Sequence, residues 1–291
     1  MLFAFCLSVI MPVYLKEYPL SGVAIREVES VTKITNPLYR GYNMLSSPGE
    51  FFLQMPEVGC FYACNGDSVE YAVEKNADPE WVNLCLCGQV LVALLHQRKI
   101  INFHASSFVF NDKGIMILGE TGAGKSSLTA SFILEGAGYL TDDLTPVVFE
   151  VRTPVVMPLK RNIKLEYDSI EQLNIPGAQL KKAEEGTGKH YMHVENKIIE
   201  KKPLHLIFKI EIGDVTTPEF TIPEQTERFS VMRSEICSWE MLAGMPDTER
   251  SYLQQLLQIV QEVPLVKIIR PQTIGIRELS SVLADYISKT R

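Results

Sequence analysis

Residues Gly119 to Ser126 are the part of the sequence whose types and spacing point most directly to chemistry. They read Gly-Glu-Thr-Gly-Ala-Gly-Lys-Ser and match the pattern G-x-x-x-x-G-K-(S/T) at every position. Glycines let the backbone curl so that successive N–H groups face phosphate oxygens. A helix that begins at Lys125 adds the positive end of its dipole. Because Lys125 then reaches the β- and γ-phosphates and Ser126 ligates Mg²⁺, the sequence predicts a nucleoside triphosphate site.

The predicted nucleotide-binding residues all belong to this loop or follow it directly: Gly119, Glu120, Thr121, Gly122, Ala123, Gly124, Lys125, Ser126 and Ser127. ATP and Mg²⁺ are the expected ligands, although no base-reading signature distinguishes ATP from GTP. Such a loop occurs in motors, switches, synthases and kinases, so the residues around it must decide the function.

Two adjacent aspartates, Asp142 and Asp143, follow Lys125 by 17 and 18 residues, at the end of the expected strand Gly138–Thr141. One carboxylate can orient the metal while the other accepts a proton from an incoming hydroxyl. A turn or a helix start is the alternative, because aspartate is common in both. The nearby phosphate loop favours the metal-and-base interpretation.

His104 lies fifteen residues before Gly119, on the expected strand Ile100–Phe110. If this strand and Ile115–Leu118 form an antiparallel hairpin across Asn111–Gly114, the beginning of the first lies beside the end of the second. His104 would then approach the phosphates. A purely structural histidine is an equally good interpretation of the sequence.

Together, His104-Ala-Ser, the loop, Gly136 and Asp142-Asp143 resemble the catalytic domain of HPr kinase/phosphorylase and the wider group of HPr-kinase-like proteins. The resemblance covers roughly residues 100–150. It implies a phosphoenolpyruvate-carboxykinase-like nucleotide fold with a mixed central sheet, and ATP·Mg²⁺ that phosphorylates a serine hydroxyl. It also implies a homo-oligomer.

The resemblance further implies a role for each matching residue. Lys125 holds phosphates and takes part in catalysis, Ser126 and Asp142 hold Mg²⁺, Asp143 is the catalytic base, and His104 assists near the transferring phosphate. Ala105 stands where the family usually carries glycine, and the segment after Val151 lacks the family's Glu-Ile-Arg-Gly-type motif. HPr as the substrate and the phosphorylase back-reaction therefore do not follow.

Other basic residues are candidates for binding an anionic substrate. Lys160, Arg161 and Lys164 lie in Leu159–Leu165, where a solvated basic strand is the alternative. On the expected mobile loop Lys181–Lys189 and just beyond it, Lys189, His190 and His193 could gate a substrate, but a plain surface loop is the better interpretation.

Three functions follow from these residues. The preferred one is a kinase that acts on a hydroxyl of a protein, a peptide or a small molecule such as serine. The second is a non-catalytic ATP-binding regulatory module. A switch or motor is weaker, because no distant acidic strand end follows a long apolar run.

The elements that must position these residues indicate an α/β fold. Expected strands cover Ile115–Leu118, Val147–Val151, Leu204–Ile212 and Leu265–Ile269, and expected helices cover Lys125–Leu134, Glu224–Leu242, Asp247–Val263 and Ile276–Lys289. The sequence predicts a P-loop catalytic domain over residues 91–291, preceded by a smaller β-rich region over residues 1–90.

The β-rich region contains one clear hairpin. Cys60–Cys64 and Ser68–Val73 flank Asn65-Gly66, which is typical of a type I′ turn. Glu50–Met55 is a further short strand. The helix expected near Pro79–Gln97 is apolar on nearly every face, so we expect it to be buried.

Composition limits the partners. The chain has 291 residues, 46% of them hydrophobic and 22% charged, which is typical of a globular protein. Its net charge of −7 argues against nucleic-acid binding. The apolar segment Met1–Leu15 is shorter than a spanning helix and lacks a basic n-region, so we expect no membrane partner and a cytoplasmic location.

Six cysteines are too few for a disulfide framework in a chain of this length. The pairs Cys60–Cys64 and Cys85–Cys87 could suggest zinc. Residues two apart on a helix do not face each other, however, so free thiols are the better interpretation.

Overall fold

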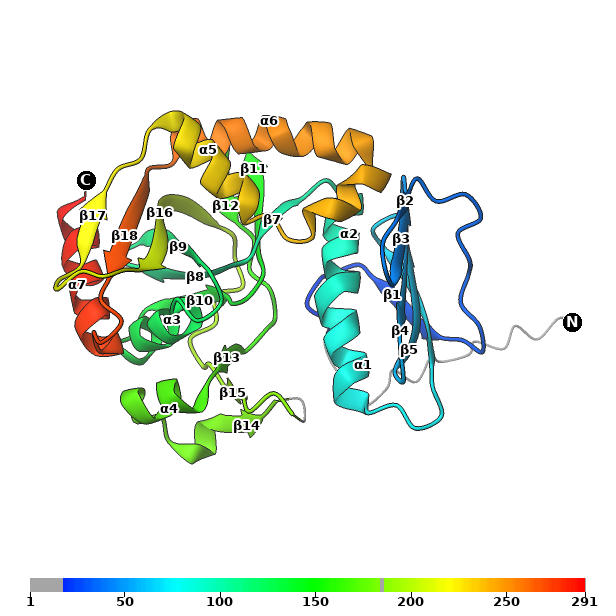
Figure 1. Ribbon diagram of the computed structural model, residues 1–291, viewed down its shortest axis with the longest axis horizontal. Helices are drawn as coiled ribbons and strands as arrows, with labels where there is room; N and C mark the ends of the chain where they lie inside the picture. The colour runs from blue at the N-terminus through cyan, green and yellow to red at the C-terminus, as the bar shows by residue number, and fades with distance from the viewer. Residues whose placement is uncertain (1–17, 184–185, 291) are drawn as a thin grey trace, which may run out of the picture. The chain divides into compact units, whose positions relative to one another are not determined.

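The computed structural model describes residues 18–183 and 186–290, and the chain divides into two compact units (Figure 1). The first, here called the N-terminal unit, comprises residues 18–98 together with Glu240–Pro246. The second, here called the loop unit, comprises Lys99–Trp239 and the chain from Asp247 onward. Met1–Leu15 and Cys6 lie outside the described residues.

The N-terminal unit is built on a six-stranded sheet in the order β1-β6-β5-β4-β3-β2. β1 pairs with β6 in parallel and the other pairs are antiparallel. The strands are β1 (Ala24–Glu27), β2 (Tyr39–Arg40), β3 (Met44–Ser47), β4 (Glu50–Met55), β5 (Gly59–Cys64) and β6 (Ser68–Val73).

The hairpin between β5 and β6 forms as expected. Cys64 pairs with Ser68, and Asn65 and Gly66 have φ of 54° and 75°, the left-handed values that the Asn-Gly pair favours. Cys60 and Cys64 lie on the sheet face that packs against Val31 and Ile34. Burial raises the pKa of the Cys60 thiol. The described residues contain no group of three or more His, Cys, Asp or Glu side chains placed to bind one metal ion.

One helical segment accompanies this sheet: α1 (Pro79–Cys85), a π-helical turn at Leu86–Val90, and α2 (Leu91–Gln97). Asp78 caps it by accepting a hydrogen bond from the backbone N–H of Glu80 at 2.9 Å. By length and composition it is the one helix in the described residues that could span a membrane, but 56% of its most apolar window is buried. The segment runs through residue 90, where the sequence analysis places the domain boundary.

The loop unit contains a mixed sheet of nine strands in the order β10-β8-β9-β16-β12-β11-β7, with β18 and β17 added beside β16. β9, β16 and β18 are parallel, and the other pairs are antiparallel. The strands are β7 (Ile101–Phe103), β8 (Ala105–Phe110), β9 (Lys113–Gly119), β10 (Gly138–Thr141), β11 (Thr145–Glu150), β12 (Thr153–Val156), β16 (Lys202–Ile212), β17 (Glu219–Thr221) and β18 (Leu265–Arg270).

The strand expected over Ile100–Phe110 is interrupted at His104. β7 pairs with β11, whereas β8 pairs with β9 and β10. The chain therefore changes partner at His104, which the sequence could not indicate because both halves are equally apolar. The antiparallel hairpin of β8 and β9 does form, with Ala105 opposite Leu118, so His104 lies beside the end of β9.

Asp142 and Asp143 lie where the chain crosses between the same two strands. β10 ends at Thr141, which pairs with Ser107, and β11 begins at Thr145, which pairs with Phe103. The intervening residues must therefore pass beside residues 104–106. Thr145 fixes this crossing by donating its hydroxyl to the carbonyl oxygen of Ala105 at 3.0 Å.

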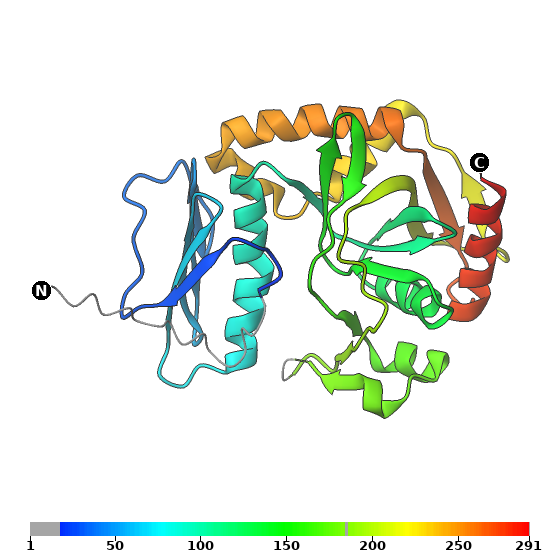
Figure 2. The same cartoon turned by 180° about the vertical axis from the view of Figure 1, so that it is seen from behind.

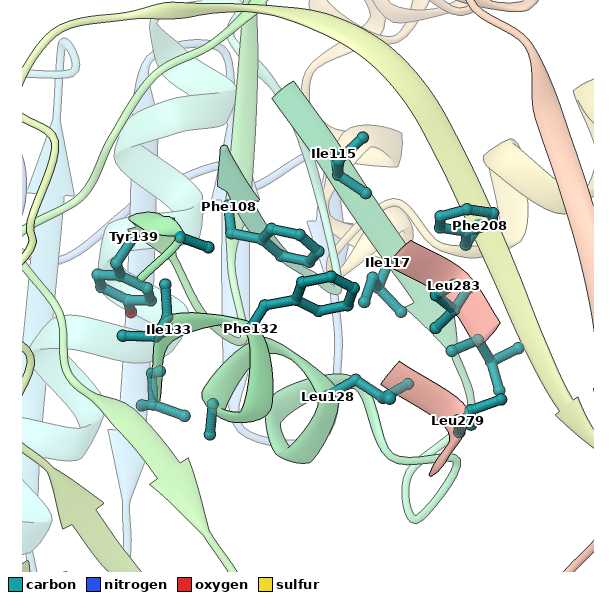
Figure 3. Close-up of a cluster of buried hydrophobic side chains, with 14 of the residues drawn as sticks. Phe108, Ile115, Ile117, Leu128, Phe132, Ile133, Tyr139, Phe208, Leu279 and Leu283 are labelled. Carbon is teal, nitrogen blue, oxygen red and sulfur yellow. The ribbon is translucent and has the colours of Figure 1, made fainter. Parts of the chain in front are cut away.

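Two helices, α3 (Lys125–Leu134) and α7 (Ile276–Lys289), cover one face of the sheet (Figures 1 and 2). Figure 3 shows the core between them: Phe132 stacks on Phe108 with ring centroids 4.4 Å apart, and Leu128 lies near Leu279. Removing a buried phenylalanine side chain typically costs about 3–5 kcal/mol, so this packing fixes where α3 begins relative to β9.

The helix expected over Glu224–Leu242 is shorter than predicted. α5 (Gln225–Ser234) ends early, and a 3₁₀ turn covers Trp239–Gly244. Residues 235–237 instead pair with the β7 backbone: the N–H of His104 donates to Glu235 O at 2.7 Å, and the N–H of Cys237 donates to Asn102 O at 3.2 Å. Long-range backbone pairing has overridden helical periodicity here.

α6 (Pro246–Glu262) forms within one residue of its expected bounds. A small three-stranded sheet in the order β13-β15-β14 also belongs to the loop unit. It consists of β13 (Ile163–Leu165), β14 (Leu180–Lys182) and β15 (His190–Met192), with α4 (Tyr167–Leu173) and a 3₁₀ turn at Gly177–Gln179. The expected loop Lys181–Lys189 thus begins in a strand, because β14 pairs with β15.

Candidate active site

The predicted phosphate loop connects the end of β9 to the first residue of α3. Gly122 and Gly124 have φ of 85° and 104°, in the left-handed region that favours glycine, and Gly124 directly precedes the helix. Lys125 is 8% exposed and donates to the carbonyl oxygens of Gly119 at 2.6 Å and Glu120 at 3.3 Å. Burial lowers the pKa of its ammonium, while the carboxylates of Glu235 and Asp142 oppose that shift.

Asp142 is buried beside this loop. Its side chain is 1% exposed, and Oδ2 accepts a hydrogen bond from the N–H of Lys164 at 3.1 Å. Burial, followed by the charge of Asp143, raises its pKa. The hydroxyls of Ser106 and Ser126 lie close enough to oppose this shift, but among the described residues nothing gives Oδ1 a hydrogen bond.

The unpaired Oδ1 is the observation that tests whether this site suits a metal. A buried carboxylate oxygen without a partner is costly, and such atoms are uncommon in folded proteins. A carboxylate and a hydroxyl are ligands that suit Mg²⁺, which keeps several waters and phosphate oxygens besides. Asp142 and Ser126 therefore fit the metal site that the sequence predicts.

Asp143 adopts a left-handed backbone conformation, with φ of 69°, which turns its side chain away from that of Asp142. Oδ1 lies 3.5 Å from Nε2 of His104, and Oδ2 lies 3.1 Å from a terminal nitrogen of Arg161. The hydrogen bond from His104, together with the charge of Arg161, holds the pKa of Asp143 well below its usual range. Asp143 is thus an oriented, ionised carboxylate that is 55% exposed.

These residues line one cavity of about 310 Å³, here called the phosphate cavity. Its walls include His104, Glu120, Thr121, Gly122, Gly124, Lys125, Ser126, Ser127, Asp142, Asp143, Lys164, Glu166, Ser169 and Lys189. The structure therefore brings together every predicted site residue except Gly119 and Ala123, which belong to the loop without lining this cavity.

Some basic residues contribute differently from what the sequence suggests. Lys164 and Lys189 reach the phosphate cavity, and Lys189 pairs with Glu166 at 2.9 Å. Arg161 instead holds Asp143. Lys160, His190 and His193 do not line the cavity. Lys160 and His193 are exposed, whereas His190 is half-buried at the start of β15 and therefore does not belong to the expected mobile loop.

A buried ion pair close to Lys125 was not foreseen. Lys209 on β16 pairs with Glu235 just after α5, and both influence the pKa of Lys125. β16 runs parallel to β9, with Ile210 opposite Gly119, which places this pair near the start of the loop. A lysine between Phe208 and Ile210 in an apolar strand was the available signal, because a buried charge needs a partner.

No protein-family model matches the chain, and no curated protein matches it. Among solved structures, the chain is similar to one described as the Hpr(Ser) kinase/phosphatase from Coxiella burnetii. The two sequences are 15% identical, the match covers 64% of this chain and 88% of that one, and the TM-score is 0.34. A similarity of this size carries no argument about binding or activity, so the function has to rest on the site itself.

Proposed function

We propose that this protein is an ATP- and Mg²⁺-dependent kinase that transfers the γ-phosphate to a hydroxyl of a protein, a peptide or a small molecule. The observation that carries the proposal is the buried Oδ1 of Asp142, which lacks a well-aligned hydrogen bond among the described residues and lies near Ser126 in the same cavity as Lys125 and Asp143. A cation held there would satisfy this oxygen and bind the phosphates at once.

In this proposal the N–H groups of residues 119–126 and the ammonium of Lys125 hold the phosphates. Ser126 and Asp142 would hold Mg²⁺, which would supply positive charge to offset the negative charge that develops during transfer. Asp143 accepts the hydrogen bond of the acceptor hydroxyl, and His104 and Arg161 keep its carboxylate in place. Because phosphoryl transfer proceeds through a loose transition state, positioning contributes more than base strength. The low pKa of Asp143 is therefore compatible with its role.

The test is a transfer assay with ATP labelled with ³²P at the γ-position, Mg²⁺, and acceptors that include serine and serine-bearing peptides. The proposal expects label in an acceptor with the native protein and none with Lys125→Ala. Label that stays in ATP with every acceptor, despite tight ATP binding, would indicate the regulatory module instead. The proposal also requires a location where ATP is abundant, which favours the cytoplasm.

A further inference from the structure

A second cavity adjoins the phosphate cavity on the other side of the loop. It has a volume of about 230 Å³ and is here called the Arg270 pocket. The two cavities share Gly122, Gly124, Ser127, Glu166 and Ser169 as lining residues. Together they reach the size of a cleft for a small organic ligand, about 300–1,000 Å³. A single extended ligand could therefore occupy both.

The two cavities differ in which end of a triphosphate they can hold. His104, Asp143 and Lys164 line the phosphate cavity but not the Arg270 pocket. In a loop of this kind the lysine reaches the β- and γ-phosphates, so the γ-phosphate lies toward Asp143. The Arg270 pocket shares Ser127 with the phosphate cavity and lacks Asp143, so it can receive the opposite end of the ligand.

The walls of the Arg270 pocket suit a flat, partly apolar group. Arg270 donates from Nε to the carbonyl oxygen of Ala123 at 3.1 Å and from Nη1 to that of Pro271 at 3.0 Å. These two bonds fix the plane of its guanidinium, and a fixed, weakly hydrated guanidinium stacks well on aromatic rings. Leu128 and Leu279, both nearly fully buried, form apolar surface beside it.

Polar groups stand around this apolar surface. The side chains of Asp168, Gln172 and Gln272 line the pocket and can exchange hydrogen bonds with base edges or ribose hydroxyls. Gln172 is already oriented, because its Oε1 accepts from the N–H of Ile276 at 3.4 Å. Hydrogen-bonding groups placed beside aliphatic side chains are typical of sites for nucleosides and similar ligands.

We infer that the Arg270 pocket binds the nucleoside of the triphosphate, with a purine base stacked on the guanidinium of Arg270. The inference rests on the proposed function, since it requires a triphosphate on the loop. A purine offers more stacking area than a pyrimidine, so the pocket discriminates by ring size.

Calorimetry with Mg²⁺ complexes of ATP, GTP, CTP and inorganic tripolyphosphate separates the two proposals. For the native protein we expect ATP and GTP to bind about tenfold more tightly than CTP, and at least tenfold more tightly than tripolyphosphate. If tripolyphosphate fails to bind, or binds equally to Lys125→Ala, the proposed function fails. If tripolyphosphate binds as tightly as ATP, only the nucleoside pocket fails.

Two variants and a control locate the effect. Arg270→Ala should lower the affinity for ATP about tenfold and leave the affinity for tripolyphosphate unchanged within about twofold. Ile274→Trp fills the pocket without removing either hydrogen bond of Arg270. It should also lower the affinity for ATP but not the affinity for tripolyphosphate. Arg152→Ala, an exposed arginine that lines neither cavity, should change neither ligand.

Each remaining outcome has a definite meaning. If Ile274→Trp weakens only ATP binding while Arg270→Ala weakens the binding of ATP and tripolyphosphate equally, the pocket remains the nucleoside site but stacking on Arg270 is overturned. Equal loss of both ligands in both variants, or unchanged ATP binding in Ile274→Trp, overturns the pocket as the nucleoside site.

Discussion

The two cavities beside the loop share five lining residues but differ in chemistry. The phosphate cavity carries the ionisable side chains His104, Asp142, Asp143, Lys164 and Lys189. The Arg270 pocket combines one guanidinium and the carboxylates of Glu166 and Asp168 with glutamine side chains and aliphatic surface. The loop therefore separates a side suited to moving a phosphate from a side suited to holding a ligand. Changes on one side should leave the other intact.

The largest effect should follow from Asp143→Asn. We expect transfer to fall by about 10²- to 10⁴-fold, because an amide oxygen accepts the acceptor's hydrogen bond less strongly and cannot take its proton. ATP affinity should stay within about threefold, since Asp143 lies at the transfer end. Single-turnover transfer and calorimetry measure the two quantities. Unchanged transfer would remove the assignment of Asp143.

Lys125→Ala should weaken both nucleotide binding and transfer, because in the proposed function its ammonium binds the phosphates. We expect ATP and tripolyphosphate affinity to fall together, and transfer to fall by about 10²- to 10³-fold. Lys160→Ala, which lines neither cavity, is the matched control. A variant that lost only ATP affinity would place Lys125 at the nucleoside side and break the comparison.

Asp142→Asn should have opposite effects on the stability of the free protein and on the binding of MgATP. The folded pKa of Asp142 is raised, so its contribution to stability is fully present below the unfolded pKa and is lost as pH rises through the folded pKa. At neutral pH, without nucleotide, the variant should therefore melt higher, by about 2–4 °C for each kcal/mol gained. The amide can still accept from Lys164 and can donate to Ser106 or Ser126.

The same variant should lose most of the stabilisation that MgATP gives the native protein, which is about 2.7 kcal/mol at 100 times Kd. Thermal melts at two pH values, with and without MgATP, test both statements. The native protein without ligand should gain stability on mild acidification and the variant should not. A lower melting temperature for Asp142→Asn at neutral pH would contradict the metal-site interpretation.

The smallest effect should follow from Ser169→Ala. Ser169 lines both cavities, and its hydroxyl lies 2.7 Å from that of Ser127. Loss of one such hydrogen bond costs about 0.5–1.5 kcal/mol, so ATP affinity should fall by roughly two- to tenfold. Ser234→Ala, on the exposed end of α5, is the control. A larger loss confined to transfer would show that the shared wall belongs to the phosphate side alone.

Several elements could be predicted because local rules govern them. α3, α7, β4, β6 and β10 have the expected bounds, since glycine, proline and apolar periodicity mark their ends. α5 and the break at His104 could not be predicted. At both places backbone hydrogen bonds between residues far apart in sequence overrode local periodicity.

The sequence alone determined the glycine-rich turn of residues 119–126, because the conformation of eight consecutive residues depends on their own glycines and on the helix that follows. It also indicated which acids and which histidine to examine. Only the tertiary structure decided their arrangement. β10 and β11 pair with strands on either side of His104, which carries Asp142 to Ser126 and turns Asp143 toward Arg161. Strand pairing is non-local, and residue spacing does not encode it.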